Sequence, residues 1–349
     1  MYKGLIDKLA SRAELSHDEY LTLIRNRDEI RDYASALARA ARHQYYGDRI
    51  YIRGLIEFTN YCKNNCYYCG IRAGNSNVDR YRLMPEDIIA CADVGYDLGF
   101  RTFVLQGGED SFYTDTILAR IVSSIRKNHA DCAITLSLGE RSRKSYQILR
   151  EAGADRYLLR HETCSKTHYE TLHPDSMSFE RRIQCICDLK ELGYQVGVGF
   201  MVGSPNQTEK HLAEELLFLK KLKPHMVGIG PFIPHKDTPF RDESGGTSEL
   251  TTFLLSLIRL TLPEVLLPAT TALGTIDPLG RENGIRAGAN VLMPNLSPVD
   301  VRKKYMLYDN KICTGEEAAQ CSTCLKNRVR TTGCEIVTDR GDYTDVPCH

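Results

Sequence analysis

The chain has 349 residues, and its 45 lysines and arginines balance 45 aspartates and glutamates. This balance excludes a strongly basic nucleic-acid surface and an acidic tail, and no apolar run approaches the ~20 residues of a membrane span. Thirteen cysteines behind a polar N-terminus without a signal peptide indicate reduced, metal-binding thiols rather than a disulfide framework. We therefore expect a cytoplasmic protein with no nucleic-acid or membrane partner.

Residues 1–46 are predicted to form a helical segment outside the main fold. Ser16 and Glu19 fit a capping box, and apolar residues recur at helical spacing as far as Ala41. From residue 50, strand-like runs alternate with helical segments, several of which end at Gly or Pro. The strand-like runs are 50–58, 102–106, 132–138, 156–160, 196–202, 226–232, 268–273 and 289–293.

This alternation predicts an α/β fold, a complete (β/α)8 barrel of the TIM type over residues 47–309. A doubly wound sheet is the alternative. After about residue 309 the alternation stops, so residues 310–349 are expected to form a cysteine-bearing tail. Polar and glycine-rich groups such as "LQGGED", "LLRHET" and "ATTALGT" follow the strands, and a barrel gathers such groups on the face that carries active sites.

The stretch "NYCKNNCYYCG" follows the first predicted strand and places Cys62, Cys66 and Cys69 at C-x3-C-x2-C spacing. Thiolates select iron–sulfur clusters, zinc or copper(I). A structural zinc site calls for a second cysteine pair, but the next cysteine, Cys91, stands alone in a predicted helix. Three thiolates therefore suit a cluster with one open iron, and structural zinc is the alternative.

At this loop the sequence resembles the radical S-adenosylmethionine (SAM) superfamily, in which a C-x3-C-x-aromatic-C loop follows the first barrel strand. Tyr68 matches the aromatic residue. The resemblance implies a 4Fe–4S cluster on the three cysteines, with SAM bound to its open iron. Gly107, Gly108 and Glu109 resemble the "GGE" motif that meets the amino group of SAM, where glycines allow close backbone approach.

Longer runs, among them "GLIEFTNYCKNNCYYCGIRAGN", "AGADRYLLRHET" and "MVGIGPFIPHKDTP", are similar to the HydE family of iron–iron hydrogenase maturases, which is related to biotin synthase and methylornithine synthase. This resemblance implies site residues from several strand ends. Those expected around SAM and the upper cavity are Gln106, Glu109, Thr135, Ser137, Arg160, Glu162, Arg182 and Met201. Thr270 and Thr271 are expected to face the cavity, and Tyr305 and Tyr308 to lie near the reactive centre as catalytic residues.

The tail carries Cys313, Cys321 and Cys324 at C-x7-C-x2-C spacing, which matches an accessory iron–sulfur cluster of some family members. The alternatives are reduced surface thiols or a zinc site completed by a later residue of the tail. The candidates for that later ligand are Cys334, Cys348 and His349. The remaining cysteines, expected as buried small hydrophobes, are Cys91, Cys132, Cys164, Cys185 and Cys187.

The HydE resemblance implies reductive cleavage of SAM to methionine and a 5′-deoxyadenosyl radical. The radical would attack a sulfur of a cysteine-bound iron precursor that carries carbonyl and cyanide, during maturation of the hydrogenase H-cluster. The implied partners are a small organometallic iron or sulfur-containing substrate, other hydrogenase maturases, and an electron donor such as a ferredoxin or flavodoxin. Alternatives are a methylornithine-synthase-like or biotin-synthase-like enzyme and, outside enzymes, a zinc-stabilised interaction barrel.

Overall fold

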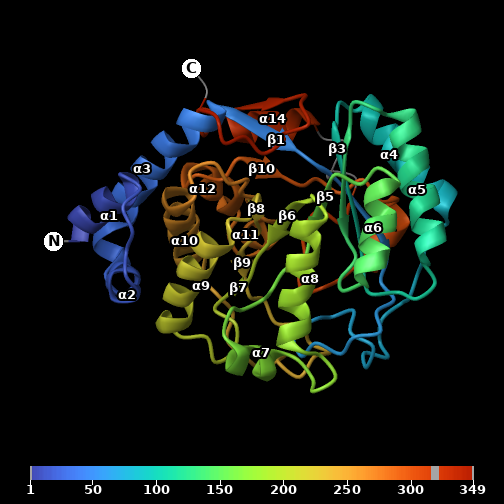
Figure 1. Cartoon of the computed structure of the whole chain (residues 1–349), viewed down its shortest axis with the longest axis horizontal. Coiled ribbons are helices and arrows are strands. Elements are labelled where there is room, and N and C mark those ends of the chain that lie inside the picture. Colours follow the sequence, from blue (N-terminus) through green and yellow to red (C-terminus); the bar gives the residue numbers. More distant parts are fainter. Residues whose placement is uncertain (1, 316–321, 348–349) are drawn as a thin grey trace.

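The computed structural model describes residues 2–315 and 322–347 as an α/β fold around a parallel sheet (Figure 1). The six strands of this sheet pair in chain order. They are β2 (Gly54–Thr59), β3 (Thr102–Gly107), β4 (Ala133–Ser137), β5 (Arg156–Leu158), β6 (Gln195–Val198) and β8 (Met226–Val227). The helices that connect them are α4 (Pro85–Asp97), α5 (Asp115–Asn128), α6 (Arg143–Glu151), α7 (Lys166–Leu172), α8 (Phe179–Glu191) and α9 (Glu209–Leu222).

Single parallel bridges continue this sheet into a ring. They join Met226 to Leu266, Pro268 to Val291 of β10 (Val291–Leu292), and Asn295 back to Leu55 of β2. Two short strands, β7 (Met201–Val202) and β9 (Gly230–Pro231), pair with each other beyond β6 and β8. The order of strands is therefore that of the predicted (β/α)8 barrel.

Four of the predicted strands are wrong in extent. The run 196–202 divides into β6 and β7, and the run 226–232 divides into β8 and β9. The other two are the first and the seventh. The run 50–58 divides at Arg53 into β1 (Arg49–Ile52) and β2, because β1 leaves the main sheet and pairs with β10 and β11 (Glu335–Val337). The run 268–273 ends early because Thr270, in extended conformation, is the N-cap residue of α11 (Thr271–Ile276). Both of these latter errors arise where an apolar run continues across a change of backbone direction.

The N-terminal helices α1 (Tyr2–Ala10), α2 (His17–Arg25) and α3 (Arg27–Tyr46) lie outside the barrel, with α2 along α9 and α3 along α10 (Ser248–Thr261) (Figure 1). The predicted capping box is present. The Ser16 hydroxyl accepts from the Glu19 N–H, and Glu19 Oε2 accepts from the Ser16 N–H across 2.8 Å. Three short helices complete the described part of the chain, namely α12 (Gly280–Arg286), α13 (Val299–Arg302) and α14 (Ser322–Arg330).

The C-terminal segment covers the amino ends of the barrel strands. Thr102, the first residue of β3, donates from its hydroxyl to the Arg340 carbonyl across 2.7 Å. Arg156, the first residue of β5 and 2% exposed, pairs with Asp342 across 2.6 Å. The opposite end, where the strand-end loops lie, is therefore the end that can carry a site.

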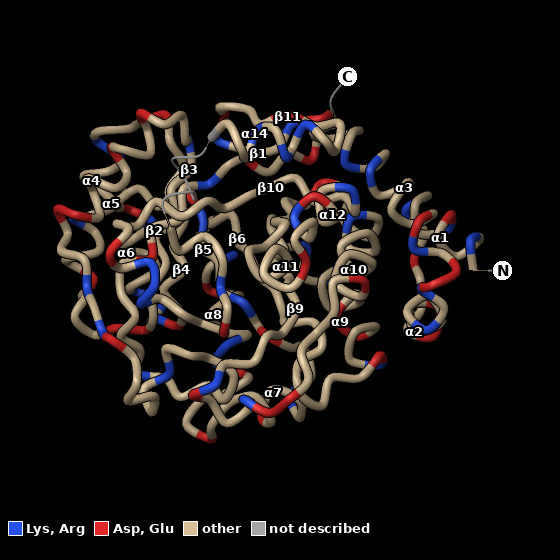
Figure 2. The backbone as a smooth tube through the Cα atoms, turned by 180° about the vertical axis from the view of Figure 1, so that it is seen from behind, with Lys and Arg blue, Asp and Glu red and all other residues tan. Residues whose placement is uncertain are grey.

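Figure 2 shows cationic and anionic residues interspersed over the outer helices, in keeping with the formal net charge of zero. No helix within residues 2–315 and 322–347 is both long and apolar enough to cross a bilayer.

Candidate active site

The cysteine loop follows β2 directly and holds Cys62, Cys66 and Cys69 as half-buried free thiols. Burial raises the pKa of Cys66 to about 12 and also raises the pKa of Cys62 and Cys69. The apo protein therefore keeps these three thiols protonated at neutral pH. A metal cluster that binds them as thiolates would release protons.

The turn after β3 packs against this loop. A Cβ atom on Gly108 would lie 2.2 Å from the Tyr61 carbonyl oxygen and 2.7 Å from Cys62 Cβ, so the position requires glycine. Next to it, Glu109 Oε2 lies 3.2 Å from Lys63 Nζ, and the Lys63 N–H donates to the Glu109 carbonyl. The predicted "GGE" turn and the cysteine loop thus form one unit.

A polar pair follows the end of β5, with Glu162 buried and Arg160 half-buried. Arg160 Nη2 is 3.1 Å from Glu162 Oε2, and neither atom has a hydrogen-bond partner among the described residues. Glu162 has a left-handed φ of 65°, and its N–H donates to the Gly199 carbonyl. Arg182, which is buried, donates from Nη1 to the Arg160 carbonyl across 2.7 Å. Buried polar atoms without partners are typical of a ligand site.

Other strand ends contribute to the same face. Gln106 on β3 is paired in register with Ser137 on β4. The Gln106 side chain donates a hydrogen bond from Nε2 to the Tyr305 hydroxyl oxygen across 3.5 Å. The hydroxyls of Thr135 and Thr270 are buried without a hydrogen-bond partner among the described residues. Met201 and Tyr305 are buried, whereas Thr271 and Tyr308 are half-buried. A surface pocket of about 260 Å³ opens beside Lys63, Glu109 and Glu140.

Residues 56–219 match the family model described as the radical SAM superfamily. The chain is 48% identical to the [FeFe] hydrogenase maturase subunit HydE of Thermotoga maritima over 297 residues, which cover 85% of this chain and 84% of that protein. The chain belongs to the radical SAM superfamily. Within it, the chain belongs to the HydE family, as the resemblance of the longer runs predicted.

More distant relatives agree with this placement. The 3-methylornithine synthase of Methanosarcina acetivorans is 31% identical over 82% of this chain and 81% of its own length. The crystal structure of methylornithine synthase (PylB) superposes with a TM-score of 0.82 at 25% identity, covering 95% of this chain and 97% of that one. The structure of HydG, at 18% identity and a TM-score of 0.82 over 97% of this chain and 76% of that one, shows the same fold. The barrel is thus a radical SAM barrel.

The radical SAM family implies a 4Fe–4S cluster and SAM, and the residues present fit both groups. Three thiols from one loop give the donor set of a cluster with one open iron. Arg160 Nη2 and Glu162 Oε2 form an ion pair with each other but no hydrogen bond, so they are suited to bind polar groups of SAM. The glycine at 108 allows a close backbone approach between the two loops.

Tyr68, the aromatic residue of the radical SAM loop, is held by a residue that the sequence did not indicate. Its hydroxyl donates to His173 Nε2 across 3.1 Å, and His173 Nδ1 donates to the Tyr169 carbonyl. Burial lowers the pKa of His173 to about 3, so the imidazole is neutral and Nε2 is an acceptor. No motif relates the two residues, which lie 105 positions apart.

A buried ion pair inside the barrel was also missed. Glu57 on β2, which is 1% exposed, binds Lys311 Nζ across 2.5 Å and accepts from Asn295 Nδ2 across 2.8 Å. Lys311 also donates to the Tyr305 carbonyl and lies 4.9 Å from the centre of the Tyr305 ring. A glutamate within the apolar run "GLIEFT" was the available signal, since buried charges are rare unless paired.

The tail cysteines are only partly described. Cys313 is half-buried, and Arg281 Nη1 lies 3.7 Å from its sulfur. Cys324 lies in the first turn of α14. Cys321, Cys348 and His349 lie outside the described residues, and Cys334 is buried. Elsewhere, the prediction of buried cysteines is confirmed for Cys91, Cys132 and Cys185, whereas Cys164 and Cys187 are half-buried.

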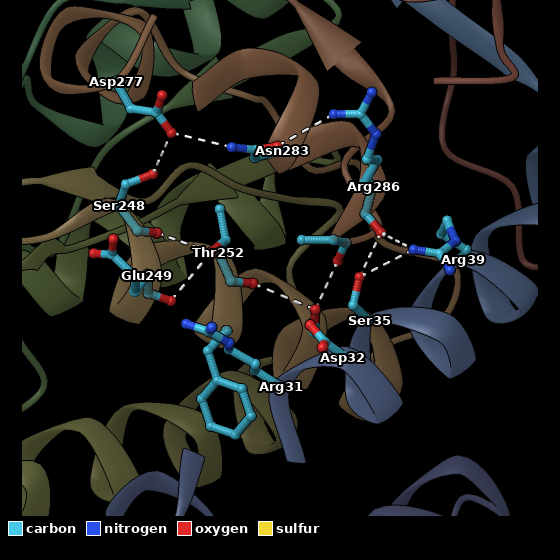
Figure 3. A pocket seen from close by; sticks show the side chains of 13 residues that line it. Arg31, Asp32, Ser35, Arg39, Ser248, Glu249, Thr252, Asp277, Asn283 and Arg286 are labelled. Atoms are coloured by element: carbon cyan, nitrogen blue, oxygen red, sulfur yellow. Dashed lines mark hydrogen bonds between the residues drawn. The ribbon is translucent and has the colours of Figure 1, made fainter. Parts of the chain in front are cut away.

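A second pocket, of about 350 Å³, lies on the outside of the barrel between α3, α10 and α12 (Figure 3). Its polar groups bind one another. The Ser248 hydroxyl and Asn283 Nδ2 both donate to Asp277, and the Ser35 hydroxyl donates to the Arg286 carbonyl. None of the residues that line it is a predicted site residue, so it is not part of the active site.

Proposed function

We propose that this protein reductively cleaves SAM during maturation of the [FeFe] hydrogenase H-cluster and acts on a cysteine-bound iron precursor that carries carbonyl and cyanide. The 48% identity to HydE over 85% of the chain carries this proposal. When bound, the 4Fe–4S cluster would supply the electron that cleaves the C5′–S bond of SAM into methionine and a 5′-deoxyadenosyl radical.

The protein binds and orients the cluster and SAM, and it excludes water from the site. Cys62, Cys66 and Cys69 would hold the cluster as its three protein ligands. Gly107, Gly108 and Glu109 would receive the amino group of SAM. Glu162 would bind its ribose, and Arg182 would pair with its carboxylate. The C-terminal segment, which covers the amino ends of the strands, would limit the entry of water from that end.

The cavity below SAM would receive the substrate. The unpartnered hydroxyls of Thr135 and Thr270 are suited to bind its polar ligands, and Tyr305 and Tyr308 would lie at the reactive centre. We assign residues 1–46 to a helical segment, 47–309 to the barrel and 310–349 to the tail. The tail would carry an accessory cluster on Cys313, Cys321 and Cys324. Other maturases and a ferredoxin or flavodoxin would be the partners.

A methylornithine-synthase-like mutase is the second candidate, because a 3-methylornithine synthase is 31% identical and the PylB structure superposes with a TM-score of 0.82. In-vitro maturation separates the two. The reconstituted protein is incubated anaerobically with SAM, reductant, the other maturases and apo-hydrogenase. We expect hydrogen evolution that depends on this protein and is lost in Cys62→Ala. Formation of methylornithine from lysine, without hydrogenase activation, would select the mutase.

A further inference from the structure

Arg80 joins the two ends of the cysteine loop. Its Nη1 donates to the carbonyls of Asn60, before the first cysteine, and Ile71, after the last; the second contact is 2.8 Å. Its Nη2 donates to the carbonyls of Arg72 and Asn75 across 2.7 and 3.2 Å. One rigid, planar guanidinium therefore fixes the loop at both ends.

The chain segment that carries Arg80 is itself fixed to the start of the loop. Asn60, which is fully buried, donates from Nδ2 to the Asp79 carbonyl across 2.9 Å and accepts from the Tyr81 N–H at Oδ1 across 2.8 Å. These bonds hold the residues on either side of Arg80. The guanidinium is thus already oriented before any cluster binds.

No described carboxylate forms an ion pair with Arg80. Its neighbours along the chain are paired, Asp79 with Lys304 across 2.8 Å and Arg82 with Asp110 across 2.6 Å. Burial lowers the pKa of Arg80, while the charges of Cys62 and Cys69 act in the opposite direction. The guanidinium thus faces carbonyls of the cysteine loop and of the residues that follow it, and its charge is not neutralised by a described carboxylate.

We propose that Arg80 is the positioning residue of the radical SAM cluster: it clamps the three-cysteine loop in its ligand-ready shape and places an unpaired positive charge beside the cluster. A fixed cation and hydrogen bonds around a cluster stabilise its reduced form and raise its reduction potential. The inference goes beyond the proposed function, because it holds for any substrate that the radical meets.

Two substitutions of Arg80 separate the effect of its hydrogen bonds to the loop from the effect of its positive charge. Arg80→Lys keeps the charge but replaces the planar fork with a single ammonium group, whereas Arg80→Gln removes both. The matched control is Arg82→Gln, which loses the ion pair with Asp110 but no hydrogen bond to a loop carbonyl. Each reconstituted protein is measured for the rate of iron release to a chelator and for cluster midpoint potential by EPR-monitored titration. Circular dichroism checks the fold.

We expect both Arg80 variants to release iron at least about tenfold faster than wild type, with Arg82→Gln unchanged. The potential should become more negative in Arg80→Gln and stay near wild type in Arg80→Lys. Two outcomes would overturn the clamp: iron release at the wild-type rate in Arg80→Lys, or equally fast release in Arg80→Gln and Arg82→Gln. A midpoint potential that is unchanged in Arg80→Gln would overturn the charge effect.

If Arg80→Gln does not fold, the iron-release rate of Arg80→Lys alone decides whether the clamp exists. Neither readout needs a hydrogenase, so failure here is distinct from failure of the proposed function.

Discussion

The Tyr68 hydroxyl and His173 Nε2 are joined by a 3.1 Å hydrogen bond that links the cysteine loop to the C-terminal end of α7. Tyr68→Phe leaves the buried Nε2 acceptor without a donor, which costs about 1–3 kcal/mol of unfolding free energy. Urea unfolding of the apo protein measures the loss. Tyr67→Phe is the control, because the Tyr67 ring packs edge-on against Phe240 and does not contact His173. Equal stability of Tyr68→Phe and wild type would argue against the bond.

His173 also predicts a pH dependence of stability. Its pKa is about 3 in the folded protein because of burial, against an ordinary value of 6.5. The unfolded chain therefore binds the extra proton between these values, and stability is complete above pH 6.5 and falls as the pH drops toward 3. At pH 5 the loss from this residue is about 2 kcal/mol. His173→Gln should remove that loss when unfolding free energies at pH 7.5 and 5 are compared; an identical pH slope in both proteins would refute it.

The buried pair of Glu57 and Lys311 predicts a large effect of breaking one partner only. Lys311→Met leaves an unpaired carboxylate in the barrel and should destabilise the protein by about 3–5 kcal/mol. The double variant Glu57→Gln with Lys311→Met removes both charges and should recover most of this loss. Chemical unfolding of the three proteins tests the expectation. Equal destabilisation in the single and double variants would show that the charge of Glu57 is not the cause.

A side chain at position 108 should hinder cluster assembly for steric reasons. In Gly108→Ala the new Cβ meets the Tyr61 carbonyl and Cys62, so the cysteine loop must shift. We expect at least about half of the cluster iron to be lost on reconstitution, measured as iron and acid-labile sulfide per chain. Gly4→Ala is the control, since a Cβ there meets nothing within 4 Å. Full cluster content in Gly108→Ala would contradict the close contact between the two loops.

The barrel could be predicted from the sequence because strand and helix patterns alternate along it. The face expected to carry the site could be predicted because the polar groups follow the strands. It did not resolve the division of 50–58 at Arg53, since "RIYIRGLIEFT" is apolar on both sides of the break. The contacts of Arg80, His173 and Lys311 were also missed. Each depends on chain segments that only the fold brings together, and no spacing along the chain encodes such contacts.

The most direct test of the account is formation of 5′-deoxyadenosine by the anaerobically reconstituted, dithionite-reduced protein in the presence of SAM. Cys62, Cys66 and Cys69 are the proposed cluster ligands, so the wild-type protein should yield 5′-deoxyadenosine and methionine in equal amounts. Cys66→Ser should yield neither above the background of a protein-free control. Intact SAM after incubation with a protein that carries a full, reduced cluster would contradict the assignment of this loop as the site of radical generation.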